Sequence, residues 1–88
     1  MDRLTRLEAA LEGSLMHVEA WGDHPAIHSI MVQLEYLIGL ETGHTRDRSL
    51  VRELSLGVLA TREIEHRDTA LAELLHAVAD DVKRTADR

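Results

Sequence analysis

The sequence predicts an all-α protein, a small up-and-down bundle of four helices that occupies residues 1–88 as a single domain. Three observations support this fold class. The residues that favour helices, Leu, Ala, Glu and Arg, dominate the composition, and there is a single Pro. Apolar residues recur at steps of three and four along most of the chain. A chain of 88 residues is also too short to hold two separate cores.

The first two helices are predicted by apolar spacing and by the turn between them. The first runs from about Asp2 to Trp21, with apolar positions Leu4, Leu7, Leu11, Leu15 and Val18. The stretch Gly22-Asp23-His24-Pro25 separates the two helices, since Pro suits a first helical position. The second helix ends before Gly43 and carries the core stripe Ile27, Ile30, Met31, Leu34, Leu37 and Ile38.

The third and fourth helices follow the connector at 42–45. Thr45 or Asp47 is expected to cap the third helix, whose predicted core face is Leu50, Leu54, Val58 and Ile64. Gly57 lies in its middle at a cost of about 1 kcal/mol relative to Ala, which predicts a close helix crossing there. A break at 65–69 with Asp68 as N-cap precedes the fourth helix, which carries Leu71, Leu74, Leu75, Val78 and Val82.

Most of the net charge of −6 lies in the first half of the chain. Residues 7–45 contain six carboxylates and no Lys or Arg, while residues 46–88 contain eight basic and nine acidic residues. Nucleic acid is bound through Lys and Arg, so this distribution argues against it and favours an electropositive protein partner. The longest uncharged run has eleven residues, His24 to Leu34, too short for a membrane span. With no Cys and no apolar leader, we expect a cytoplasmic protein.

Histidines and carboxylates are the candidates for metal binding or catalysis. His24 and His28 are four residues apart and could share a helix face. Zinc needs three or four ligands, however, and no further residue lies at a spacing typical of a zinc ligand. Two Glu-x-x-His pairs, Glu63/His66 and Glu73/His76, match the spacing of di-iron bundles, which are longer. We interpret these residues as solvated helix faces, and predict no cofactor, no metal and no enzymatic activity.

A second apolar stripe on the second helix is the strongest sign of a binding surface. Val32, Tyr36 and Leu40 lie roughly opposite the core stripe, with Glu35 and Glu41 beside them. Leu56 and Leu59 also fall off the predicted core face of the third helix. A helix that is apolar on two faces lends one of them to a partner or to another copy of the chain. The predicted partner site is therefore Val32, Glu35, Tyr36, Leu40 and Glu41.

Three segments resemble a known family: Gln33-Leu34-Glu35-Tyr36-Leu37, Asp47-Arg48-Ser49-Leu50 and Leu54-Ser55-Leu56-Gly57. They are similar to segments of the small helical immunity proteins that protect bacteria from type VI secretion effectors that hydrolyse NAD(P)+. The resemblance spans roughly Gln33 to Val78. It implies a protein that docks on a cognate toxin domain and covers its NAD(P)+ cleft.

Two other functions remain open at this point. The same surface could serve a general helical adaptor or a scaffold that forms homo-oligomers. A metal-binding bundle built on His24, His28 and the Glu-x-x-His pairs is the third hypothesis. Immunity by binding a toxin domain is the function that we predict.

Overall fold

A computed structural model describes residues 2–86, and these residues form a helical bundle, which confirms the predicted fold class. The long helices are α1 (Arg3–Trp21), α2 (Pro25–Thr42) and α4 (Thr69–Ala86). Between α2 and α4 lie a 3-10 turn, η1 (Val51–Glu53), and α3 (Leu56–Leu59), which continues directly as the π-helical η2 (Ala60–Ile64). None of the helices within residues 2–86 is both long and apolar enough to cross a bilayer.

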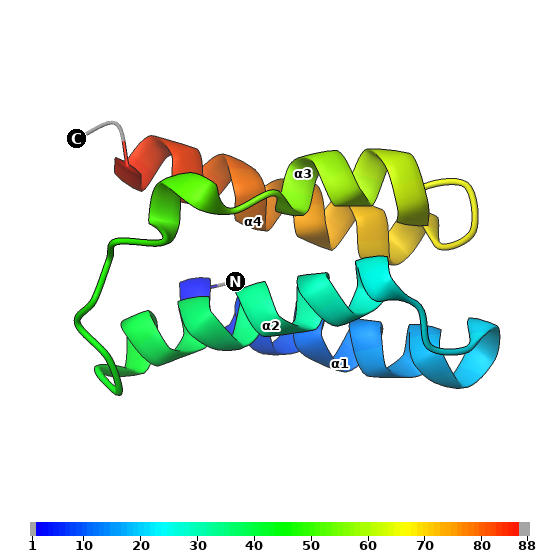
Figure 1. The fold of residues 1–88 in the computed structure, drawn as a ribbon, viewed down its shortest axis with the longest axis horizontal. Coiled ribbons are helices and arrows are strands. Elements are labelled where there is room, and N and C mark those ends of the chain that lie inside the picture. Colours follow the sequence, from blue (N-terminus) through cyan, green and yellow to red (C-terminus); the bar gives the residue numbers. More distant parts are fainter. Residues whose placement is uncertain (1, 87–88) are drawn as a thin grey trace.

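The bundle consists of two helical hairpins packed against each other (Figure 1). In one hairpin α1 runs antiparallel to α2, and in the other α3 with η2 runs antiparallel to α4. α1 packs on α4, and α2 packs on α3. One end of the bundle holds the α1–α2 turn and the start of α4, and the other holds the chain termini and the connector between α2 and η1.

The boundaries of the first two helices follow from their caps. The Asp2 carboxylate accepts a hydrogen bond from the Thr5 amide at 2.7 Å and starts α1. Gly43, with φ of 81°, ends α2 in the left-handed conformation that glycine adopts without strain. Pro25 is the first residue of α2, as predicted.

The core face of α1 is rotated from the predicted leucine stripe. Its buried residues are Leu7, Ala10, Ser14 and His17. Leu15, expected in the core, is 50% exposed. The reason is the approach of α4: a Cβ on Gly13 would lie 3.2 Å from Leu71 Cδ1. Small side chains on this side of α1 let α4 come close, so the apolar spacing alone misplaces the face.

The third helix starts later than predicted. Thr45 and Asp47 cap turns rather than a helix: the Thr45 hydroxyl accepts from the Asp47 amide at 3.2 Å, and the Asp47 carboxylate accepts from the Ser49 amide at 2.9 Å. Residues 44–50 are therefore a connector, and α3 begins at Leu56.

The core residues of this segment also differ from the prediction. Leu50 and Val58 are 47% and 56% exposed, whereas Leu56, expected off the core face, is buried and Leu59 packs partly against the core. The buried positions of α3 and η2 are Leu56, Ala60 and Ile64. Steps of four drift around a regular α-helix of 3.6 residues per turn. The wider turn of η2, marked by the Glu65 amide bonding to the Ala60 carbonyl, counteracts that drift.

Two predictions about the second hairpin are confirmed. Asp68 caps α4, because its carboxylate accepts from the Leu71 amide at 3.1 Å. Gly57 lies at a close crossing, where an added Cβ would be 3.4 Å from the Ala79 Cβ on α4. Because Asp68 caps α4, the break before the fourth helix lies where the sequence predicts it.

Candidate protein-binding site

The predicted outer stripe of α2 is exposed at one position and partly covered at the other two. Val32 is 59% exposed, and Glu35 next to it is exposed as well. Tyr36 and Leu40 are half-buried and pack against the edge of the core. The stripe is thus not one continuous free surface, although all its members lie on α2.

Tyr36 is partly covered because the connector after α2 folds back over it. Its hydroxyl donates to the Asp47 carbonyl at 2.7 Å, and the Thr45 amide donates to the Gly39 carbonyl at 3.2 Å. Hydrogen bonds from the Ser49 hydroxyl and amide lower the pKa of Asp47 below its ordinary value. Tyr36 therefore holds this connector in place, a role that helix periodicity cannot reveal.

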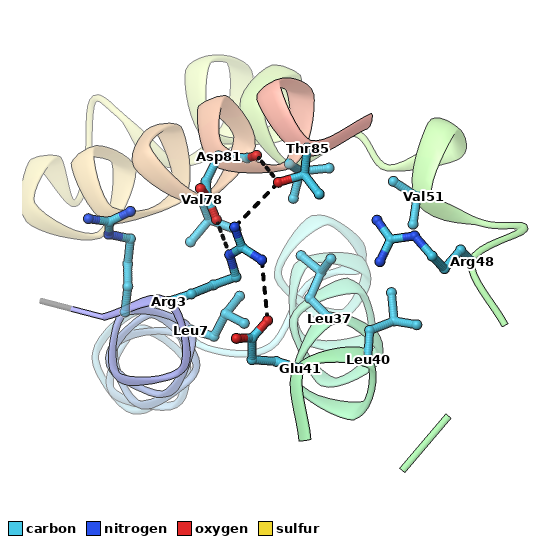
Figure 2. A pocket seen from close by; sticks show the side chains of 12 residues that line it. Arg3, Leu7, Leu37, Leu40, Glu41, Arg48, Val51, Val78, Asp81 and Thr85 are labelled. Carbon is cyan, nitrogen blue, oxygen red and sulfur yellow. Dashed lines mark hydrogen bonds and ion pairs between the residues drawn. The ribbon is translucent and has the colours of Figure 1, made fainter. Parts of the chain in front are cut away.

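Glu41 belongs to an ion-pair network that joins three helices (Figure 2). Arg3 of α1 donates from Nε to Asp81 of α4 at 2.7 Å and lies 3.5 Å from Glu41 of α2. Its third contact is the Thr85 hydroxyl at 3.4 Å. The hydrogen bond to Asp81, with the charge of that carboxylate, raises the pKa of Arg3 above its ordinary value. The sequence gives no hint of this network, because Arg3 and Asp81 are 78 positions apart.

Below this network lies a small pocket of about 40 Å³ at the end of the bundle that holds the termini. We call it the Arg3 pocket. Its apolar walls come from α1, α2, η1 and α4, and consist of Leu7, Leu37, Leu40, Val51, Val78 and Val82. Arg6 and Arg48 also line it. Two members of the predicted partner site, Leu40 and Glu41, lie in this pocket.

The acidic first half gives the α1–α2 hairpin an exposed negative surface. Within residues 2–86, four glutamates of this hairpin are exposed and form no ion pair: Glu8, Glu12, Glu19 and Glu35. The hairpin contributes no Lys or Arg between residues 7 and 42. Its surface is therefore suited to an electropositive partner.

The predicted histidine pair does not form a shared site. His28 is exposed and lies 3.9 Å from Asp23, whereas His24 turns inward and accepts from the Ile27 amide through Nδ1 at 3.3 Å. The other nitrogen of His24, Nε2, lies 3.2 Å from Nε2 of the buried His17. Across residues 2–86 there is no group of three or more His, Asp or Glu side chains arranged to hold a metal ion.

The Glu-x-x-His pairs lie at the surface. Glu63, His66 and Glu73 are exposed, and His76 contacts the Thr61 hydroxyl at 3.4 Å. The inward-facing carboxylates of a di-iron bundle are therefore not formed by these pairs. The features that remain are apolar side chains at the surface, unpaired charges and a small pocket, which are typical of a helical protein-binding module.

The comparisons with known proteins agree with this class. The Tsi6 family model matches residues 4–84, so the chain belongs to the Tsi6 family of type VI secretion immunity proteins. The solved structure of Tsi6 from Pseudomonas aeruginosa has the same fold, with a TM-score of 0.84 and 22% sequence identity. The similarity covers 93% of this chain and 95% of that one. No curated protein matches the chain.

Proposed function

We propose that this chain protects its cell by binding a cognate type VI secretion toxin domain, and that this toxin hydrolyses NAD(P)+. The observation that carries the proposal is the family match over residues 4–84, together with a fold shared with Tsi6 over almost the whole chain. The chain has no chemistry of its own in this proposal, and acts in the cytoplasm by blocking the toxin's active site.

The charge of the α1–α2 hairpin supports the choice of toxin. A site that binds the phosphates of a dinucleotide is electropositive, and the four unpaired glutamates of this hairpin complement such a site. Opposite charge speeds the encounter of two proteins. Affinity comes from apolar side chains that become buried in the complex.

The proposed contact surface is on α2: Val32, Glu35, Tyr36 and Leu40, with Glu41 at the edge that faces Arg3 of α1. Val32 is the best candidate for an anchor, because it is 59% exposed in the free protein and gains most by burial. Tyr36 contributes a half-buried ring and positions the connector. Glu35 is the acidic side chain of this set that is free to meet a basic group, since Glu41 already pairs with Arg3.

Coexpression with the product of the neighbouring gene tests the function. The proposal expects that cells regain growth and that their NAD(P)+ content, which the toxin depletes, returns to normal. Growth rescue without any NAD(P)+ depletion by the toxin alone would keep the immunity role and refute the toxin's chemistry. No rescue and no complex between the purified proteins would refute the immunity role.

Val32→Arg tests the surface. It should weaken toxin binding by about tenfold or more, as loss of an interface anchor does. Val58→Arg on α3 is the matched control, because Val58 is 56% exposed, close to the 59% of Val32. Surface-binding kinetics and circular dichroism melts measure both. If Val32→Arg and Val58→Arg weakened binding equally, the interface would not be centred on α2.

Glu35→Lys tests the electrostatic part of the proposal. It should mainly slow association and flatten its dependence on salt, because charges at the rim act on encounter. Glu63→Lys on η2 is the control, since Glu63 is also exposed but lies outside the acidic hairpin. An unchanged association rate for Glu35→Lys would contradict the electropositive partner surface.

A further inference from the structure

We propose that the Arg3 pocket is an anchor site, which takes one aliphatic side chain of the toxin domain with a carboxylate beside it. This inference rests on the proposed function and adds the place and the chemistry of one contact. It concerns a site at the end of the bundle that the family match does not assign.

The size of the pocket decides the class of occupant. Its volume of about 40 Å³ is far below the roughly 300–1,000 Å³ of pockets that bind small molecules. It exceeds the ~10–15 Å³ that one water needs. The space therefore suits the tip of a side chain rather than a nucleotide or a substrate.

The lining of the pocket decides which side chain fits. Leu7, Val51 and Val78 are each at most 7% exposed, and with Leu37 they form walls without a polar group. A polar tip placed there would lose its hydrogen bonds to water without replacement. An aliphatic tip such as that of Leu or Ile loses nothing and gains contacts.

The rim of the pocket carries positive charge that has no partner within the described chain. Arg3 is neutralised by Asp81 and Glu41. Arg6 and Arg48 line the same pocket, and neither forms an ion pair with a carboxylate of residues 2–86. Figure 2 shows Arg48 reaching in from the side of η1. A carboxylate next to the anchoring side chain would pair with Arg48 at the mouth of the pocket.

The pocket is built before the partner arrives. Its walls come from α1, α2, η1 and α4, and the Arg3 network joins α1, α2 and α4 beside it. The Tyr36 hydroxyl holds the connector that carries Arg48. A site that is already ordered loses little conformational freedom when it binds, which favours affinity.

The pocket also continues the proposed surface on α2. Leu40 and Glu41 belong to both, so one partner can cover Val32 and reach the pocket along the same helix. The interface then combines an acidic part on the hairpin with a basic mouth at its end. This alternation of negative and positive charge fixes how the two proteins align when they bind.

Filling the pocket from within provides the test. Thr85→Met places an aliphatic chain at the pocket edge, because Thr85 lines it. Affinity for the toxin domain should fall by about tenfold, as blocking a central anchor does. The matched control is Thr69→Met at the opposite end of α4, where Thr69 is exposed. It should leave affinity within about twofold, as surface changes outside an interface do.

Two charge reversals test the mouth of the pocket. Arg48→Glu should weaken binding about tenfold, whereas Arg52→Glu, four residues along and outside the pocket, should change it less than threefold. Melting curves verify that all variants fold. Normal binding by both Thr85→Met and Arg48→Glu would overturn the anchor site and leave the immunity role intact.

A probe separates the pocket from the immunity role. 4-Methylpentanoate carries the branched end of leucine and a carboxylate, and methyl NMR of the free protein follows its binding. Shifts at Leu7, Val51 and Val78 that Thr85→Met abolishes would support the pocket even if no toxin complex forms. Isoamylamine, with the opposite charge, should give weaker shifts. Equal shifts with both probes, or none with either, would overturn the assignment.

Discussion

The two ends of the bundle are held together by different physics. At the end with the α1–α2 turn, the buried His17 hydrogen-bonds to the half-buried His24, and its other ring nitrogen lies 3.5 Å from Asp68. At the end with the termini, exposed ion pairs centred on Arg3 surround an apolar pocket. We call these the histidine end and the arginine end. The first is built around a buried side chain, and the second is where we place the proposed anchor site.

At the histidine end, hydrogen bonding assigns each ring nitrogen a role. His24 Nδ1 accepts from the Ile27 amide, so the His24 proton resides on Nε2 and points at His17 Nε2. The proton of His17 then resides on Nδ1, a buried nitrogen that lies 3.5 Å from the Asp68 carboxylate without forming a hydrogen bond. The buried imidazole of His17 is thus hydrogen-bonded to His24 at the start of α2 and lies beside Asp68 at the start of α4.

At the arginine end, the same task is performed by charge at the surface. Arg3 is about half exposed, and its partners Asp81 and Glu41 are partly exposed, with side chains 22% and 33% accessible. Exposed ion pairs are screened by water and contribute little stability. The histidine end is therefore held by a buried side chain, and the arginine end by exposed ion pairs beside the apolar side chains of the Arg3 pocket.

The largest effect that this comparison predicts is for His17→Ala. Removing a buried ring leaves a cavity and takes away the partner of His24 Nε2, so the free energy of unfolding should fall by about 2–4 kcal/mol. Urea denaturation followed by circular dichroism measures it.

His28→Ala is the control for this prediction. The His28 side chain is 70% exposed, so its loss should change stability by less than about 0.5 kcal/mol. A loss below 1 kcal/mol for His17→Ala would mean that the histidine end does not anchor the bundle.

The contrast also separates what the sequence can predict from what it cannot. Residues at helix starts, such as Asp68 and Pro25, act on their neighbours in the chain, so their effect is visible in the sequence. The helix boundaries predicted near them agree with the structure. His17 and Arg3 act on residues 51 and 78 positions away, so their roles appear only when the helices are packed.

The errors in the core faces have local causes that are partly readable. The rotation of α1 follows from the small residues Ala10, Gly13 and Ser14, which admit α4. Their spacing is visible in the sequence, but leucine periodicity outweighs it. The late start of α3 depends on Tyr36, which holds the connector. Its hydroxyl bonds to the backbone carbonyl of Asp47, eleven positions away in the sequence. Of the predicted site, the position on α2 was readable and the covering of Tyr36 was not.

A smaller effect is predicted for Arg3→Ala at the arginine end. Half-exposed pairs contribute about 0.5–1 kcal/mol, so stability should fall by no more than that, and less in high salt. The loss of toxin affinity should be larger than the loss of stability, because Arg3 lines the pocket. Thermal melts at two salt concentrations and binding kinetics measure the two effects.

Arg62→Ala, at an exposed position on η2, is the control for general loss of positive charge. It should affect neither stability nor binding. If Arg3→Ala instead destabilised the protein as much as His17→Ala, the two ends would not differ in the way that we describe.

The smallest effect concerns the cap at the start of α1, beside the arginine end. Hydrogen bonding to Thr5 lowers the pKa of Asp2 below its ordinary value of 3.8. A pKa that is lower in the folded protein means that the ionised form is favoured by folding. The stabilisation from the Asp2 cap is therefore complete well above pH 3.8. It disappears as the pH falls through the pKa that Asp2 has in the folded protein. Asp2→Ala should slightly lower the melting temperature at pH 6, and this effect should shrink as the pH falls below 3.8. Asp80→Ala, at an exposed position of α4, should show no such pH dependence through a cap. Because Asp2 adjoins Arg3 in the chain, a large effect of Asp2→Ala on toxin binding would show that this cap also orders the pocket.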